Sequence, residues 1–126
     1  MSQPNSQPYH DGDKVHLFLA YFGIFSLIPY LSFRNQTRDA QKAYVHWHAS
    51  QGLGLVIIAV AFSIGLNIVS IALTAAGLGL VAMVLGLASL VVSLGFLGAM
   101  ILGWVKAFQG EQFEIPVVSL VAAKLR

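Results

Sequence analysis

The chain has 126 residues, of which 57% are hydrophobic and only 10% are charged. Soluble domains carry about 25% charged residues, so this composition predicts one small membrane-embedded domain. The formal net charge of +2 argues against a nucleic-acid partner, and the absence of cysteine excludes disulfides, thiolate catalysis and zinc–thiolate or iron–sulfur sites.

The first third of the chain predicts a polar tail and a first membrane helix. Residues 1–12 are rich in Ser, Gln, Asn and Pro, which predicts a disordered tail ahead of a helical membrane domain over residues 13–126. The tail has no basic n-region, so we expect no cleavable secretion signal. The uncharged run Val15–Phe33 fits the roughly 17–25 residues of a spanning helix, and Pro29 predicts a kink near Phe25.

A polar connection, Arg34–Lys42, follows this first span. Within it, Thr37 or Asp39 can cap the next helix. That helix opens with a mixed polar and apolar lead-in, Ala40–Gln51, which runs directly into the second span. We expect the lead-in to lie at the interface, with Trp47 at the headgroup boundary.

The middle of the chain is uncharged: no Asp, Glu, Lys or Arg occurs between Lys42 and Lys106. Such a run has room for two spanning helices of about 20 residues each and a tight connection. We expect a second span over Gly52–Thr74, a reversal at Ala75–Gly79 and a third span over Leu80–Phe108. The predicted fold is all-α, with three transmembrane helices and interfacial helical segments.

Two groups of side chains in these spans favour contacts with other helices. Asn67 is the one strongly polar group of the second span, and it shares a helix face with two serines. This polar stripe is Ser63, Asn67 and Ser70. Small residues recur at every fourth position near the end of the third span and predict a ridge that a second backbone can approach closely. The ridge is Gly95, Ala99, Gly103 and Ala107.

The C-terminal segment Ile115–Ala123 is apolar but too short to cross a bilayer. We expect a helix lying in the interface, with Lys124 and Arg126 turned toward lipid phosphates. Three spans place most of the positive charge on the side of the C-terminus, so the positive-inside rule predicts an outside N-terminus and a cytoplasmic C-terminus. A four-span alternative requires the C-terminal segment to cross and divides the charges less cleanly.

Residue types that carry chemistry are sparse. His46 and His48 are two positions apart, about 200° around a helix, so they cannot chelate one ion. The sequence has no nucleophile–base set and no phosphate-binding glycine loop. We therefore predict no catalytic, cofactor-binding or metal site and no enzymatic activity.

Three pieces of the chain carry a resemblance: Asp13-Lys14 opening LAYFGIFSLIPYL, then HWHASQGLGL, then WVKAFQGEQFEIP. They resemble a family of small bacterial membrane proteins of unknown function that is similar to the chloroplast inner-envelope import component Tic-twenty. The matching positions are Pro29, His48, Gln51, Lys106, Ala107, Gly110, Glu111, Phe113 and Pro116. The resemblance implies a compact three- or four-helix domain in a bacterial inner membrane, without known catalysis.

Two functions fit these features. The first is an accessory or assembly subunit of a larger membrane complex, because a helix-packing ridge is present without catalytic residues. The alternative, by analogy with the plastid relative, is a translocation or channel component, which needs a wet path around Asn67. The expected partners are the lipid bilayer and other membrane-protein subunits or further copies of this chain.

Overall fold

The computed structural model describes residues 9–115 and 117–126, and this part of the chain contains helices and turns but no strand. The α-helices are α1 (Lys14–Leu19), α2 (Leu27–Ser32), α3 (Ala40–Ala75), α4 (Gly79–Phe108) and α5 (Val118–Leu125). Two short 3₁₀ helices, η2 (Asp11–Asp13) and η3 (Gly23–Ser26), precede α1 and α2. The all-α prediction is confirmed for the described residues.

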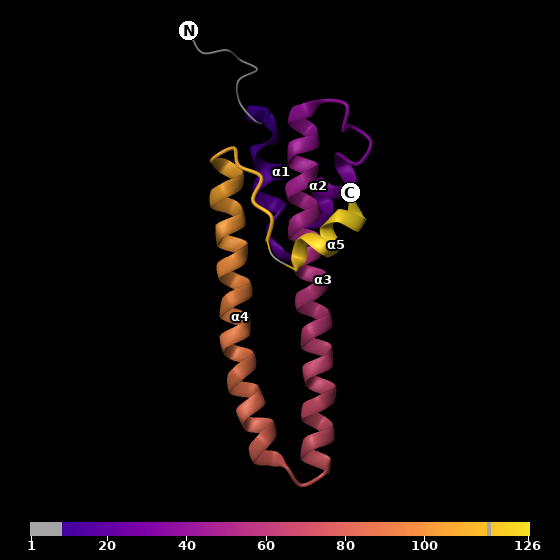
Figure 1. The fold of residues 1–126 in the computed structure, drawn as a ribbon. Helices are drawn as coiled ribbons and strands as arrows, with labels where there is room; N and C mark the ends of the chain where they lie inside the picture. Colours follow the sequence, from indigo (N-terminus) through magenta and orange to yellow (C-terminus); the bar gives the residue numbers. More distant parts are fainter. Residues whose placement is uncertain (1–8, 116) are drawn as a thin grey trace.

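Helices α3 and α4 form a long hairpin, to which the other helices are attached (Figure 1). They contain 36 and 30 residues and are therefore about 54 and 45 Å long. The chain reverses between Ala75 and Gly79, as predicted. Gly77 there takes a φ of +84°, and the Leu78 N–H donates to the Leu73 carbonyl. This is a Schellman ending, which glycine permits because it has no Cβ to clash in the left-handed conformation.

The part of the hairpin around this turn, residues 56–102, has no fully buried residue, and we call it the distal hairpin. In the most apolar 18-residue windows of α3 and α4, 6% and 0% of the residues are buried. Both helices are long and apolar enough to cross a membrane. A water-soluble protein would cover such surfaces with other elements, so these observations favour a membrane location in which lipid covers them.

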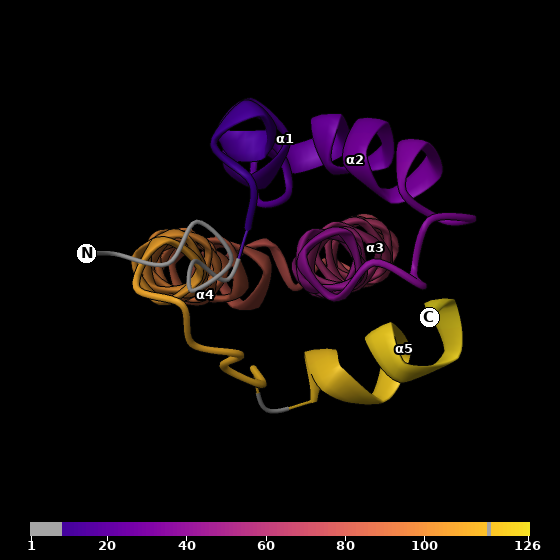
Figure 2. The same ribbon diagram turned by 90° about the horizontal axis from the view of Figure 1, so that it is seen from above.

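At its other end the hairpin is covered by the remaining helices. We call this part the head; it comprises α1, η3, α2, α5, the opening of α3 and the end of α4. Seen along the hairpin, α1 and α2 lie on one side of the layer formed by α3 and α4, and α5 lies on the other (Figure 2). The opening of α3 is therefore enclosed, with Val45 and Ala49 fully buried. The predicted interfacial lead-in is an interior segment of the head.

Two glycines of α3 allow helices to pack on both of its faces. Gly52 and Gly54 are two positions apart, so they face nearly opposite sides of the helix. A Cβ on Gly52 would lie 1.6 Å from the backbone oxygen of Ala20, which follows α1. A Cβ on Gly54 would lie 3.3 Å from the Val118 oxygen of α5. The close crossing of α1 over α3 therefore depends on glycine at position 52.

The segment Val15–Phe33 does not form one continuous helix, so that part of the sequence interpretation was wrong. It breaks after α1, where Phe22 has a non-helical ψ of 63° and Gly23 a φ of +58°. Pro29 lies in the first turn of α2, where its missing N–H has no helical partner to lose. The three-span count is not confirmed, because within residues 9–115 and 117–126 only α3 and α4 are long enough to span.

Local capping agrees with the sequence at the start of α3. Asp39 is the N-cap residue, and its Oδ1 accepts a hydrogen bond of 2.9 Å from the Gln41 N–H. Its Oδ2 accepts from His10 Nε2 at 3.0 Å. These two bonds hold the pKa of the Asp39 carboxyl below its ordinary value, the His10 bond having the larger effect.

The end of the predicted polar tail contacts the head. The Tyr9 ring stacks on that of Tyr44 with 6.3 Å between centroids. Asp13, which directly precedes α1, makes no capping bond and instead pairs with Lys42 at 3.3 Å. Residues 1–8 of the predicted tail lie outside the described residues.

Candidate functional site

The head contains a buried polar cluster around His48. The Tyr21 hydroxyl and His48 Nδ1 are 2.7 Å apart and form a hydrogen bond, and both side chains are at most 1% exposed. The Tyr44 ring packs edge-on against the His48 ring with 4.6 Å between centroids. Tyr21 reaches this position because α1 crosses α3 closely at Gly52. The bond joins the N-terminal layer of the head to α3.

Several buried polar atoms near this layer have no hydrogen-bond partner among the described residues. The side chain of Gln51 is fully buried with both amide atoms in this state, as is Ser26 Oγ. Most buried polar atoms in proteins are paired, with protein groups or with buried water, so these atoms are positions at which an ordered water would fit the chemistry of the head. Among the described residues, no three His, Asp or Glu side chains gather in a way that could hold a metal ion.

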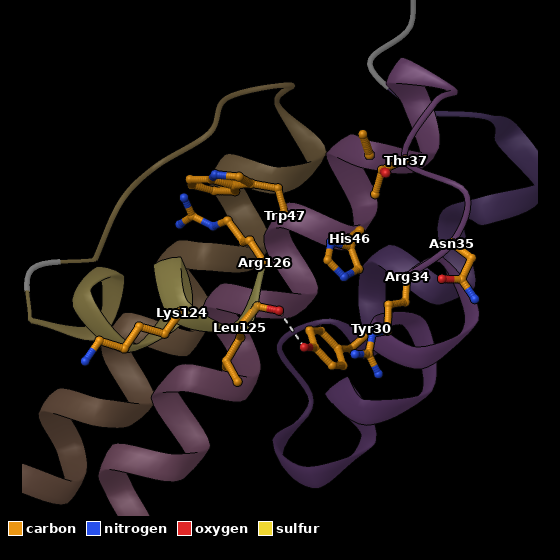
Figure 3. A pocket seen from close by; sticks show the side chains of 10 residues that line it. Tyr30, Arg34, Asn35, Thr37, His46, Trp47, Lys124, Leu125 and Arg126 are labelled. Carbon is orange, nitrogen blue, oxygen red and sulfur yellow. Dashed lines mark hydrogen bonds between the residues drawn. The ribbon is translucent and has the colours of Figure 1, made fainter.

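A second candidate site is a basic pocket of the head that lies between α2, the start of α3 and the end of α5 (Figure 3). Its volume is about 520 Å³. Side chains from the end of α2, the following loop, the opening of α3 and the end of α5 converge on it. They are Tyr30, Arg34, Asn35, Thr37, Ala43, His46, Trp47, Lys124, Leu125 and Arg126.

Aromatic contacts and one hydrogen bond give this basic pocket its shape. The rings of Tyr30 and His46 stack with 5.0 Å between centroids. The Arg126 guanidinium lies 4.7 Å from the centroid of the Trp47 ring. The Tyr30 hydroxyl donates to the backbone carbonyl of Leu125, which ties α5 to α2 across the opening (Figure 3).

The charge of the pocket lining is positive. Arg34, Lys124 and Arg126 line it without any Asp or Glu side chain, and no carboxylate of the described residues forms an ion pair with them. Four of the five acidic residues of the chain pair elsewhere, with partners His10, Lys14, Lys42 and Lys106. The side chains that line the pocket therefore combine three cations with the aromatic rings of Tyr30, His46 and Trp47.

A third site lies within the distal hairpin, where serines of α4 face the predicted polar stripe. A notch of about 490 Å³ is lined by Ser63 and Asn67 of α3 and by Ser89 and Ser93 of α4. The Asn67 amide donates to the Ser63 carbonyl of its own helix at 2.9 Å. Ser70 does not line the notch. The structure thus places Ser63 and Asn67 of the predicted stripe next to Ser89 and Ser93 of α4. The sequence interpretation had not predicted this contact between the two helices.

The small-residue ridge divides between two environments. Gly103 and Ala107 are buried inside the head, and a Cβ on Gly103 would lie 2.5 Å from the Tyr21 ring. The Tyr44 hydroxyl donates to the Ala107 carbonyl. Gly95 and Ala99 instead line an apolar cavity of about 310 Å³ that α5 borders. The buried half of the ridge packs within this chain and is not available to a partner helix.

The C-terminal segment WVKAFQGEQFEIP, on which part of the resemblance depends, ends helix α4. Gly110 takes a φ of +84°, its N–H donates to Ala107, and the Glu111 N–H donates to the Lys106 carbonyl at 2.9 Å. This is a second Schellman ending, and an ion pair of 2.9 Å between Lys106 and Glu111 closes it. Pro116 lies outside the described residues. Of the matched positions, His48 and Gln51 are the ones that bring buried polar groups into the head.

Comparison with protein families, curated proteins and solved structures finds no match. The resemblance to the Tic-twenty-like family accordingly remains an inference from the residues quoted above. Sequence reasoning did not find the basic pocket as a unit, because its cations come from segments some 90 residues apart. The only signal was the expectation that Lys124 and Arg126 meet lipid phosphates.

Proposed function

We propose that this chain is a non-catalytic integral membrane protein that acts as an accessory or assembly subunit of a larger membrane complex. The observation that carries the proposal is the polar notch of the distal hairpin. Ser63, Asn67, Ser89 and Ser93 line a hollow in a surface that is mostly apolar. Polar groups at hydrocarbon depth stabilise helix association when a partner helix supplies hydrogen bonds, so the notch is a site for one.

The proposed membrane arrangement follows from dimensions and charge. The 20 residues 56–75 of α3 rise about 30 Å, the thickness of a bilayer hydrocarbon core. All seven Lys and Arg residues lie outside the distal hairpin, in the head or in the segments that adjoin it. The positive-inside rule then favours a cytoplasmic head and a hairpin turn on the outer face of a bacterial inner membrane. In this arrangement the chain spans twice and both described ends are cytoplasmic, whereas three spans would place the N-terminus outside.

Single cysteines in this cysteine-free chain test the arrangement. We expect an impermeant thiol reagent to label Ala76→Cys in intact cells and to leave Gly12→Cys and Gln112→Cys unlabelled until the membrane is opened. Labelling of Gly12→Cys with protection of Gln112→Cys would instead support three spans.

Assembly is tested by replacing the amide of the notch. Asn67→Leu removes the polar group while keeping an apolar helix surface, and Ile68→Leu is a matched control on the neighbouring exposed position. We expect Asn67→Leu to reduce the recovery of co-purified membrane subunits or of higher oligomers in mild detergent, and Ile68→Leu to leave both unchanged. An unchanged oligomer size and partner set for Asn67→Leu would contradict the proposal.

The second candidate is a translocation or channel component, which the polar lining of the same notch favours. Such a role needs water at the notch, formed by several copies around it. Asn67→Cys distinguishes the two functions: rapid reaction with a soluble charged thiol reagent supports a wet path, and a protected thiol supports helix packing.

A further inference from the structure

We propose that the basic pocket of the head binds the phosphate of an anionic phospholipid. This inference goes beyond the assembly role and depends only on the membrane location of the hairpin. The ligand class follows from the lining: Arg34, Lys124 and Arg126 supply positive charge, and no acidic side chain shares the pocket. Guanidinium groups match phosphate oxygens in geometry as well as in charge.

A buried unpartnered nitrogen provides an independent indication of a ligand. His46 lines the pocket, is only 6% exposed, and its Nε2 has no hydrogen-bond partner among the described residues. Tyr30 stacks on one face of its ring, so the imidazole is held in a fixed orientation at the pocket floor. A ligand oxygen at this position would accept or donate the missing hydrogen bond, depending on the tautomer.

The depth of the pocket in the bilayer favours a lipid rather than a soluble phosphate. Trp47 lies nine residues, about 14 Å, before the hydrocarbon-core residues 56–75 of α3. The pocket is therefore next to the headgroup layer, which extends about 5–8 Å beyond the core and in which tryptophan is enriched. The neighbouring elements also turn apolar side chains outward, with Leu31 of α2 57% exposed and Leu120 of α5 70% exposed. These side chains give the helices that form the pocket an outer surface suited to acyl chains.

The test is a binding titration with the full chain purified in a neutral detergent. Short-chain phosphatidylglycerol is compared with phosphatidylcholine of the same chain length and with inorganic phosphate. We expect saturable binding of phosphatidylglycerol only. A cation near a membrane surface contributes about a fivefold change in affinity, so Arg34→Gln and Lys124→Gln should each weaken binding about fivefold and Arg34→Gln/Arg126→Gln about 25-fold.

Arg38→Gln is the matched control, because Arg38 is an exposed cation of the same loop that does not line the pocket. Its binding should stay within twofold of the unmodified chain. Thermal unfolding without lipid identifies any variant that fails to fold, and Lys124→Gln, at an exposed position, keeps the test decisive. Equal binding of both lipids, equal losses for Arg38→Gln and Arg34→Gln, or inorganic phosphate binding as tightly as phosphatidylglycerol would each overturn the proposal. None of these outcomes depends on whether the chain assembles with other subunits.

Discussion

The crossing of α1 over α3 makes a sharp prediction for Gly52→Ala. The added Cβ would lie 1.6 Å from the Ala20 carbonyl oxygen, whereas ordinary contacts are about 3.4 Å or longer. The obstructing atom belongs to the backbone, so no side-chain rotation relieves the overlap. The end of α1 must move by about 1.8 Å, and this movement strains the Tyr21–His48 hydrogen bond as well.

The expected cost follows from two opposing terms. Overpacking of a closely packed site costs about 1–3 kcal/mol, and the backbone clash places Gly52→Ala at the upper end of that range. Alanine recovers about 1 kcal/mol of helix propensity relative to glycine. We therefore expect a net loss of about 2 kcal/mol in the free energy of unfolding.

Two measurements check this result in detergent micelles. The first is the free energy of unfolding from a denaturing-detergent titration. The second is Trp104 fluorescence in a Trp47→Phe background, because the chain has two tryptophans. The Trp104 indole donates to the Phe18 carbonyl and its ring stacks on that of Phe18. Displacement of α1 should break both contacts and red-shift the emission.

Two glycine variants calibrate the effect. Gly65→Ala adds a Cβ that meets no atom within 4 Å, so it should not destabilise the protein. Gly54→Ala makes contacts of 3.3 Å that small shifts of α5 can relieve, so its loss should be smaller than that of Gly52→Ala. If Gly52→Ala unfolds at the same free energy as Gly65→Ala and leaves Trp104 emission unchanged, the close crossing is refuted.

Three further predictions concern individual hydrogen bonds and turns. Tyr21→Phe leaves His48 Nδ1 buried without its partner, so unfolding should require about 1–3 kcal/mol less, and an unchanged stability would contradict the bond. Gly110→Ala forces a side chain into a backbone with φ of +84°, which should lower stability by about 1–2 kcal/mol in the same titration, with Gly65→Ala as control. The Asp39 carboxyl has a folded pKa below its unfolded value of 3.8, so its stabilising effect is present above pH 3.8 and is lost as the pH falls through the folded pKa. Asp39→Asn should therefore have a lower free energy of unfolding than the unmodified chain at pH 7 and the same value well below the folded pKa. A difference in acid as large as that at pH 7 would contradict a contribution from the charge of the Asp39 carboxylate.

Local signals in the sequence predicted the hairpin. The uncharged run between Lys42 and Lys106 required two apolar helices, and the glycines near position 77 allowed the reversal between them. The Asp39 cap was equally visible, since capping involves only a side chain and a backbone N–H two residues away. These features depend on neighbours within a few residues or on the solvent, so composition and spacing report them.

The break in Val15–Phe33 shows that hydropathy does not specify whether an apolar segment spans a bilayer or packs on other helices. Mean apolarity predicts that a segment avoids water, but an apolar segment avoids water equally well by spanning a bilayer or by packing on another helix. In this chain the segment packs on α3, because Gly23, with its positive φ, breaks the helix and Ala20 fits closely against Gly52. The same crossing buries Gly103, so half of the predicted ridge is used within the chain.

The all-α class, the two long apolar helices and the position of their turn can be read from the amino-acid sequence, because each follows from nearby residues and the surrounding solvent. The way in which α1, α2 and α5 enclose the opening of α3 is visible in the folded chain alone. Only the tertiary structure brought Arg34, His46 and Arg126 to one pocket. The physical reason is that helix-on-helix packing depends on the mutual fit of distant surfaces, and no local pattern of residues encodes that fit.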